Sequence, residues 1–215
     1  MAFFKDRTDA GKQLANALKE YKNNPNLIVI GLPTSMEPAY EVAQELGCRL
    51  DVYVPKEIQV PQKPDIIAGA VTDDTIVLDE LTLEKHGFQP EDIVQQVKLQ
   101  QGDSRSCLKR YRGDNRRANP TNNTIILVDD GNAQPVMVRA VLSSLRKQKP
   151  KEIIFACPVV CDQVAQFCDS LCDEIVSLHE VAKMHEIYDC YEEFTPQEEA
   201  QVHALIQKNR ESLPN

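Results

Sequence analysis

Short apolar runs alternate with helical segments along most of this sequence, and that alternation restricts the fold more than any other feature. The runs are rich in β-branched residues and end at turn residues, as is typical of strands buried on both faces of a sheet. Strands are expected at residues 27–30, 50–54, 125–128, 153–156 and 174–178. Strand, helix and strand in this order predict βαβ units, and hence an α/β fold with a Rossmann-like parallel sheet.

Helices are expected around these strands. The segment 36–46 ends at Gly47, a residue suited to the left-handed turn that closes many helices. Thr195 and Pro196 are expected to open the last helix, as an N-cap followed by proline at the first helical position. The remaining helices are expected at residues 8–21, 90–111, 136–147 and 160–171.

Residues 55–83 interrupt the alternation. Prolines precede two apolar runs, 66–71 and 75–78, which the turn-like sequence Thr72-Asp73-Asp74 joins. This pattern predicts a small hairpin inserted between the parallel units as a flap. We therefore expect a single domain over residues 1–215 that contains the flap, and the apolar hairpin is a candidate interface in a homo-oligomer.

The composition of the chain excludes several classes of protein. The chain has 215 residues, 42% of them hydrophobic and 27% charged, which supports a folded core and excludes a disordered chain. The net charge of -9 argues against binding to nucleic acid or to anionic membranes. No apolar run approaches the ~20 residues of a membrane span, and the start of the chain lacks a signal-peptide core. Because the 7 cysteines are odd in number and irregularly spaced, we expect a reduced, cytoplasmic protein.

The sharpest motif follows the strand at 125–128. Two adjacent carboxylates, Asp129 and Asp130, precede Gly131 and a short loop into a helix. Ligands of parallel sheets bind beyond the carboxyl ends of strands, and a loop that feeds a helix presents free N–H groups to an anion. Adjacent carboxylates suit a vicinal diol or a hydrated Mg²⁺. The alternative explanation is a surface turn in which an aspartate caps the helix.

With this motif, the sequence resembles the type I phosphoribosyltransferases, in particular compact members whose substrate is unknown. The resemblance covers nearly the whole chain, and its specificity lies in the order and spacing of several short stretches. These stretches are Asp6-Arg7, Ala10-Gly11, Gly31 to Pro33, 38–43, 50–56, 64–71, 126–131, Arg139-Ala140, 156–159, Tyr191 and Phe194.

The resemblance implies a transferase of the glycosyltransferase class that serves nucleotide metabolism. Such an enzyme binds phosphoribosyl pyrophosphate (PRPP) and exchanges pyrophosphate for a nitrogenous base, with the flap covering the base. Mg²⁺ would come with PRPP near Asp129 and Asp130 rather than through direct protein ligands. The implied contacts are Asp129 and Asp130 with the ribose, Gly131, Asn132, Ala133 and Gln134 with the 5′-phosphate, and Pro33, Thr34, Ser35, Met36 and Lys56 with the second anion.

Both anion-binding loops depart from the family pattern. Where the family continues with Thr-Gly-x-Thr, this chain has Gln134-Pro135-Val136-Met137, and Pro135 has no N–H to donate. Where the family has Pro-Arg-Gly-Gly, Pro33-Thr34-Ser35-Met36 stands here, and Thr34 with Glu37 has the form of a capping box. The sequence leaves enzymatic activity open, so the alternative is a catalytically impaired homologue that serves as a regulatory or protein-interaction module.

Two further features leave alternatives open. The basic stretch at 105–117 is either a solvated helix end or a contact for a phosphate. Cys157, Cys161, Cys168 and Cys172 suit the packing of a core better than they suit a zinc site, because zinc requires paired, converging cysteines.

Overall fold

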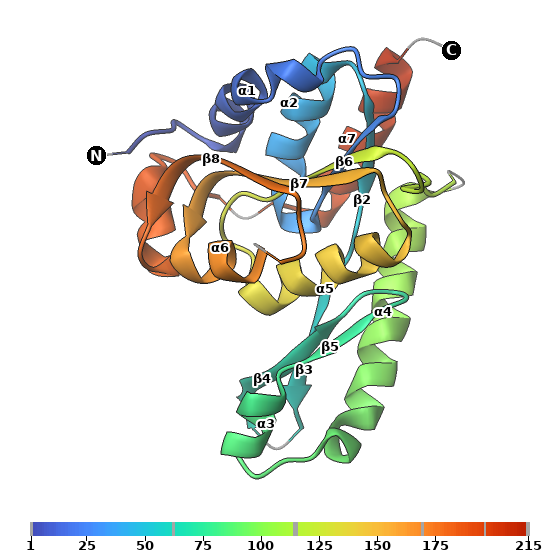
Figure 1. The fold of residues 1–215 in the computed structure, drawn as a ribbon, viewed down its shortest axis with the longest axis vertical. Helices are drawn as coiled ribbons and strands as arrows, with labels where there is room; N and C mark the ends of the chain where they lie inside the picture. Colours follow the sequence, from blue (N-terminus) through green and yellow to red (C-terminus); the bar gives the residue numbers. More distant parts are fainter. Residues whose placement is uncertain (1, 62, 114–115, 169, 196, 214–215) are drawn as a thin grey trace.

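The computed structural model describes residues 2–61, 63–113, 116–168, 170–195 and 197–213. Its central sheet is parallel throughout and has the strand order β2-β1-β6-β7-β8 (Figure 1). Every residue of β1 and β6 is buried, as the apolar runs predicted. The strands are β1 (Leu27–Gly31), β2 (Arg49–Val52), β6 (Thr124–Val128), β7 (Glu152–Cys161) and β8 (Glu174–Val181).

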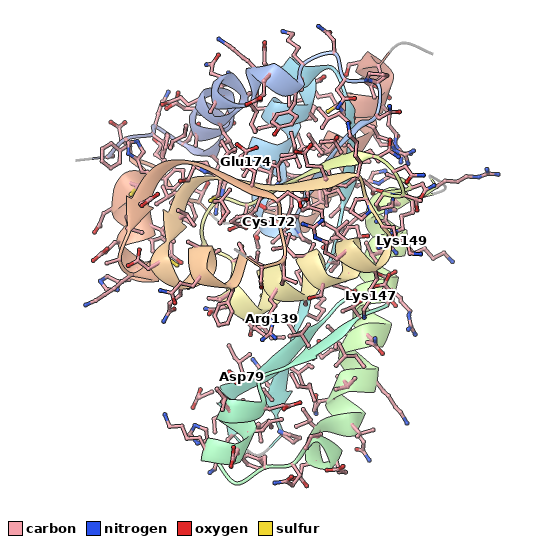
Figure 2. The ribbon with its side chains drawn as sticks, in the orientation of Figure 1. Asp79, Arg139, Lys147, Lys149, Cys172 and Glu174 are labelled. Atoms are coloured by element: carbon pink, nitrogen blue, oxygen red, sulfur yellow. The ribbon has the colours of Figure 1, made fainter. Side chains whose placement is uncertain are left out.

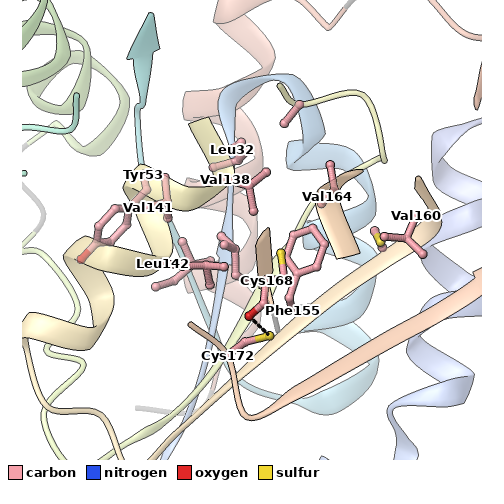
Figure 3. Close-up of a cluster of buried hydrophobic side chains, with 14 of the residues drawn as sticks. Leu32, Tyr53, Val138, Val141, Leu142, Phe155, Val160, Val164, Cys168 and Cys172 are labelled. Carbon is pink, nitrogen blue, oxygen red and sulfur yellow. Dashed lines mark hydrogen bonds between the residues drawn. The ribbon is translucent and has the colours of Figure 1, made fainter. Parts of the chain in front are cut away.

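Helices cover both faces of this sheet. On one side lie α1 (Arg7–Ala17), α2 (Met36–Leu46) and α7 (Glu199–Ser212), and on the other lie α5 (Pro135–Lys147) and α6 (Asp162–Cys168) (Figure 1). Alternate residues of β1 divide between two apolar cores, because successive side chains of a strand point to opposite faces. Ile28 and Ile30 pack with residues of α5, and Val29 packs with residues of α2. Figure 3 shows Leu142 and Phe155 in the first of these cores.

The flap is an antiparallel sheet below α5, backed by a long helix (Figure 1). Its strands are β3 (Lys56–Val60), β4 (Lys63–Val71) and β5 (Ile76–Leu78), followed by α3 (Glu80–Lys85), the 3₁₀ turn Pro90–Ile93 and α4 (Val94–Arg112). The predicted hairpin is β4 with β5, in which Ala70 pairs with Val77. The sequence interpretation missed β3, because Pro55 and Pro61 suggested a loop although they flank the strand rather than interrupt it.

The fold class predicted from the sequence, α/β with a parallel sheet and an inserted flap, is confirmed. Most element bounds differ from the predictions by a few residues. The first predicted helix ends as α1 at Ala17, and a short 3₁₀ turn at Lys19–Tyr21 follows it. The second, α2, ends at Gly47 with a φ of 69°, as its glycine predicted.

Two predicted helix starts are wrong. The helix expected from Val160 begins at Asp162, because β7 continues through Pro158 to Cys161. Proline is tolerated there since β6 pairs with β7 only up to Ala156, which leaves one side of the strand without a partner. The last helix begins at Glu199 rather than at Thr195. The carbonyl of Thr195 accepts a hydrogen bond from the Arg7 guanidinium instead, and Pro196 lies outside the described residues.

Candidate functional site

The two carboxylates after β6 are buried beneath their own loop. Asp129 is 1% exposed and Asp130 is 0% exposed. Asp129 Oδ2 accepts hydrogen bonds from the amides of Gly131 (2.9 Å) and Ala133 (3.3 Å), and Asp130 Oδ1 accepts one from the amide of Asn132 (3.0 Å). Three of the four amides that the resemblance assigns to the 5′-phosphate therefore already donate to carboxylates. An anion at this loop would compete with both groups.

Gly131 makes the tight turn of this loop possible. Its φ is 97°, and a Cβ placed there would lie 2.5 Å from the carbonyl oxygen of Val159. Any side chain at this position meets both an unfavourable backbone conformation and the backbone of β7. The loop is therefore held against the sheet. Gln134, which completes it, is exposed and precedes α5.

Arg7 supports the carboxylates from behind. Its Nε lies 2.8 Å from Asp130 Oδ2, and both side chains are at most 5% exposed. The guanidinium also lies over the ring of Phe194, with 3.7 Å from its carbon to the ring centroid. The hydroxyl of Tyr191 donates to the carbonyl of Asp130 (2.9 Å). Residues that carry the resemblance but received no role from the sequence thus form one buried cluster.

Burial changes the protonation of this cluster. Desolvation, and then the neighbouring charge of Asp130, raise the pKa of Asp129 to about 7 although loop amides oppose the shift. Burial also raises the pKa of Asp130, and the Arg7 guanidinium counteracts part of that effect. Asp129 Oδ1 is buried and has no hydrogen-bond partner in the part of the chain that the structure describes. Near neutral pH, Asp129 can therefore exist as the acid or as the carboxylate.

The loop after β1 obtains its cap from a distant part of the chain. Residues Pro33–Ser35 form a 3₁₀ turn before α2. The amides of Met36 and Glu37 donate to Oε1 of Gln197, at 2.9 and 3.4 Å. The capping box predicted from Thr34 and Glu37 is wrong, since the 3₁₀ turn puts Thr34 in the wall of a cavity and Gln197 satisfies the helix amides.

The interior of this loop is fixed by Ser35. Its hydroxyl donates to the carbonyl of Val128 at the end of β6 (3.2 Å) and accepts from the amide of Leu32 (3.3 Å). Ser35 and Met36 are both fully buried. Of the predicted second-anion residues, these two therefore face the protein interior, whereas Pro33, Thr34 and Lys56 face the cavity.

That cavity has a volume of about 420 Å³ and lies beyond the carboxyl ends of β1 and β2. It brings the loop after β1, the residues after β2 and the first turn of α5 to one place. Asp129, Asp130 and the residues 131–134 are not in its lining. The walls are Leu32, Pro33, Thr34, Val54, Pro55, Lys56, Glu57, Gln59, Gln100, Tyr111, Met137, Gln197 and Val202. The sequence did not reveal Glu57 or Gln197, because neither belongs to a motif.

The turn between β4 and β5 is attached to the main sheet's helix α5. Asp74 Oδ1 accepts from the hydroxyl of Ser144 (2.6 Å), and Lys147 Nζ lies 3.2 Å from the Thr75 hydroxyl. Figure 2 shows Lys147 and Arg139 on the side of α5 that faces the flap.

Several arginines of the basic stretch 105–117 form internal bonds. Arg105 donates to the carbonyl of Asp73 (2.9 Å), and Arg117 Nη1 lies 3.0 Å from Asp73 Oδ2. Arg112 forms a buried ion pair with Asp51, with 2.7 Å between Nε and Oδ1. Much of the stretch therefore holds the flap and β2 in place.

The cysteines pack inside the protein. All 7 thiols are free and buried. Cys172 Sγ donates to the carbonyl of Cys168 at 3.2 Å (Figure 3). Within the described ranges, no group of three or more His, Cys, Asp or Glu side chains is arranged to hold a metal ion. Nor is any helix there long and apolar enough to cross a membrane.

Comparison with known proteins identifies similar chains. No family model matches the sequence. Two proteins of Mycobacterium tuberculosis, "Putative phosphoribosyl transferase MT0597" of strain CDC 1551 / Oshkosh and "Putative phosphoribosyl transferase Rv0571c" of strain ATCC 25618 / H37Rv, are each 29% identical over 212 residues. The match covers 97% of this chain and 47% of each relative. The chain thus spans about half the length of the curated relatives it matches.

A solved structure supports the same fold. The crystal structure of TT1426 from Thermus thermophilus is 27% identical, with a TM-score of 0.79 and coverage of 97% of this chain and 99% of that one. A purine phosphoribosyltransferase from Pyrococcus horikoshii Ot3 aligns at 18% identity over 82% of this chain and 85% of its own, with a TM-score of 0.48.

Fold and site together define an α/β protein with a cavity at the carboxyl end of a parallel sheet. Among such proteins, this chain is similar to the phosphoribosyltransferases, and the resemblance predicted from the sequence is confirmed.

Proposed function

We propose that this protein binds PRPP or a nucleoside monophosphate in the cavity beyond β1 and β2 and exchanges pyrophosphate for a nitrogenous base. The observation that carries the proposal is the convergence of Pro33, Thr34, Lys56 and Met137 on that one cavity. Its volume of about 420 Å³ falls within the range of small-molecule sites. The names of the relatives agree with this class of ligand.

Lys56 gives the cavity a positive group for the leaving pyrophosphate. It follows β2, is half-buried and lies in the same wall as Thr34. In the exchange, the bond between the anomeric carbon and the pyrophosphate oxygen breaks, a bond from that carbon to a base nitrogen forms, and the proton of that nitrogen leaves with the pyrophosphate or to solvent. Negative charge accumulates on the departing group, and a positioned ammonium stabilises it.

Asp129 and Asp130 are proposed to act on the ribose side, next to the start of α5. Both carboxylates lie beneath the loop 131–134, so contact with ribose hydroxyls requires this loop to open. In the closed loop neither carboxylate lines the cavity. Because burial raises the pKa of Asp129 to about 7, protonation of this carboxyl favours the closed loop and its ionisation favours opening towards solvent.

Mg²⁺ is proposed to enter with the pyrophosphate and not through a cage of protein ligands. The described residues offer no set of three metal-binding side chains, and both aspartates already accept hydrogen bonds from amides. Mg²⁺ commonly keeps waters and binds through substrate phosphates, which fits such a site. When bound, the ion neutralises pyrophosphate.

Titration calorimetry with PRPP and Mg²⁺ tests the proposal. We expect binding by the wild-type protein and an affinity at least about tenfold lower for Lys56→Gln, because a charge-assisted hydrogen bond is lost. Lys98→Gln, which removes an exposed lysine of α4 outside the cavity, is the control and should bind like the wild type. Absence of heat at millimolar PRPP would end the proposal.

Turnover is a separate measurement. Release of pyrophosphate from PRPP is followed with a panel of purine and pyrimidine bases. Binding with release identifies an enzyme and its base. The impaired homologue with a regulatory or interaction role stays a prediction, and binding without release of pyrophosphate for any base would favour it.

A further inference from the structure

A second cluster of charged groups lies where β2, the end of α4 and the end of α7 meet. Asn209 of α7 fixes this junction, because its side chain accepts from the amide of Leu50 (2.8 Å) and donates to the carbonyl of Cys48 (3.1 Å). These backbone groups flank Arg49. The next residue of α7 is Arg210, so the docking of Asn209 brings Arg210 to the start of β2.

Arg112 and Asp51 form the buried part of the cluster. Asp51 is 1% exposed, and each of its carboxylate oxygens is already used. Oδ1 accepts from Arg112 Nε (2.7 Å) and from the amide of Val52 (2.8 Å), and Oδ2 accepts from the amide of Ala118 (2.6 Å). Asp51 therefore pairs with Arg112, and its single negative charge leaves the charges of two further arginines to be balanced.

The other two arginines lack an acidic partner among the described residues. Arg49 donates through Nη2 to the carbonyl of Arg116, but its Nε is buried without a hydrogen-bond partner. Arg210 Nη2 is likewise buried, and none of the described residues bonds to it. Burial, together with the nearby charges of Arg49 and Arg112, lowers the pKa of Arg210 although the charge of Asp51 opposes the shift. Three arginines thus share the charge of one carboxylate within the described ranges, which leaves a local excess of two positive charges in a protein whose net charge is -9.

We propose that Arg49 and Arg210 bind a phosphate group at this junction, next to the buried ion pair of Arg112 and Asp51. The uncompensated charge of two guanidiniums matches a dianion, and the planar fork of a guanidinium fits phosphate oxygens in pairs. Both side chains are partly exposed, so the group can approach from solvent. On binding, the unpartnered nitrogens turn towards its oxygens. The phosphate is either free inorganic phosphate or part of a nucleotide.

This junction is distinct from the cavity proposed for PRPP. Val202, which lines that cavity, lies about 12 Å along α7 from Arg210, at 1.5 Å per residue. The two sites can therefore be followed separately. The phosphate site also stands without the proposed function, because it rests on the contacts of Arg49 and Arg210 at the start of β2.

Nuclear magnetic resonance of the arginine side chains tests the proposal. The Nε–Hε signal of Arg49, assigned by its loss in Arg49→Lys, is followed while inorganic phosphate replaces chloride at constant ionic strength. We expect this signal to shift and saturate in the millimolar range. In Arg210→Gln, the apparent affinity should fall about tenfold or more. Lys98→Gln removes the same charge from an exposed position and should bind phosphate like the wild type.

A second titration, with adenosine monophosphate, identifies the source of the phosphate. If adenosine monophosphate saturates the Arg49 signal at a lower concentration than inorganic phosphate does, the result supports the site and assigns it to a nucleotide. Equal or weaker binding supports the site and assigns it to free phosphate. Shifts confined to backbone amides around the 420 Å³ cavity, with Arg49 unchanged by both ligands, would overturn the phosphate site and leave the proposed function standing.

Discussion

The loop after β6 and the loop after β1 leave the same end of the sheet but satisfy their amides in different ways. After β6, the acceptors are carboxylates within four residues of the amides they bind. After β1, the acceptor is the neutral side chain of Gln197, which is 161 residues from Met36. Hydrogen bonds to charged groups are about twice as strong as neutral ones. A ligand anion therefore displaces Gln197 more easily than it displaces Asp129 or Asp130.

The largest effect on stability is expected for Arg7, which pairs with Asp130 beneath the loop 131–134. Arg7→Gln leaves Asp130 buried without its counterion, which should reduce the free energy of unfolding by about 3–5 kcal/mol. Urea denaturation measures the loss. Lys5→Gln, an exposed neighbour, is the control and should change stability by less than about 0.5 kcal/mol. If both variants are equally stable, Arg7 does not hold this loop.

Gly131→Ala should have the next largest effect. The strained φ of 97° and the contact with the carbonyl of Val159 together predict a loss of about 2–4 kcal/mol. Gly47→Ala is the matched control, since its φ of 69° is also left-handed but no atom lies within 4 Å of the added Cβ. The control should lose about 1 kcal/mol. Equal losses would show that backbone conformation alone determines the cost.

The raised pKa of Asp129 predicts a dependence of stability on pH. An unfolded aspartate titrates near 3.9, so between that value and about 7 the folded protein binds more protons than the unfolded one. Stability from this group is complete below pH 4 and is lost as the pH rises through 7. Asp129→Asn should therefore gain about 2 kcal/mol relative to wild type between pH 5 and 8.

Urea denaturation at several pH values measures this gain. Asp65→Asn, an exposed aspartate of β4, is the control and should keep a constant difference from wild type. A constant difference for Asp129→Asn as well would show that burial does not hold this carboxyl in its acid form.

The smallest effect on stability is expected for Gln197→Ala. This variant also tests most directly whether the loop after β1 binds an anion. Loss of the cap from Met36 and Glu37 should cost about 1 kcal/mol. The freed amides should bind pyrophosphate more tightly than in the wild type, as measured by calorimetry. Gln95→Ala, an exposed glutamine of α4, should change neither quantity. Weaker pyrophosphate binding in Gln197→Ala would show that Gln197 contacts the ligand rather than competing with it.

Features that depend on neighbours in the sequence were predictable. The apolar runs of β1 and β6 and the Gly47 stop of α2 follow from local periodicity and backbone freedom. The burial of Asp130 could not be predicted in the same way, because its partner Arg7 lies 123 residues away. The false capping box at Thr34 has the same origin. A short motif predicts which amides need a partner, but not whether a distant side chain reaches them first.

Because the flap turn is attached to α5, this helix couples the flap to the loop 131–134. α5 begins directly after the loop 131–134, and near its other end Ser144 and Lys147 hold Asp74 and Thr75. With 13 residues, α5 is about 20 Å long and links the two regions as one rigid element. Any opening of the loop that tilts this helix must therefore also move the flap turn.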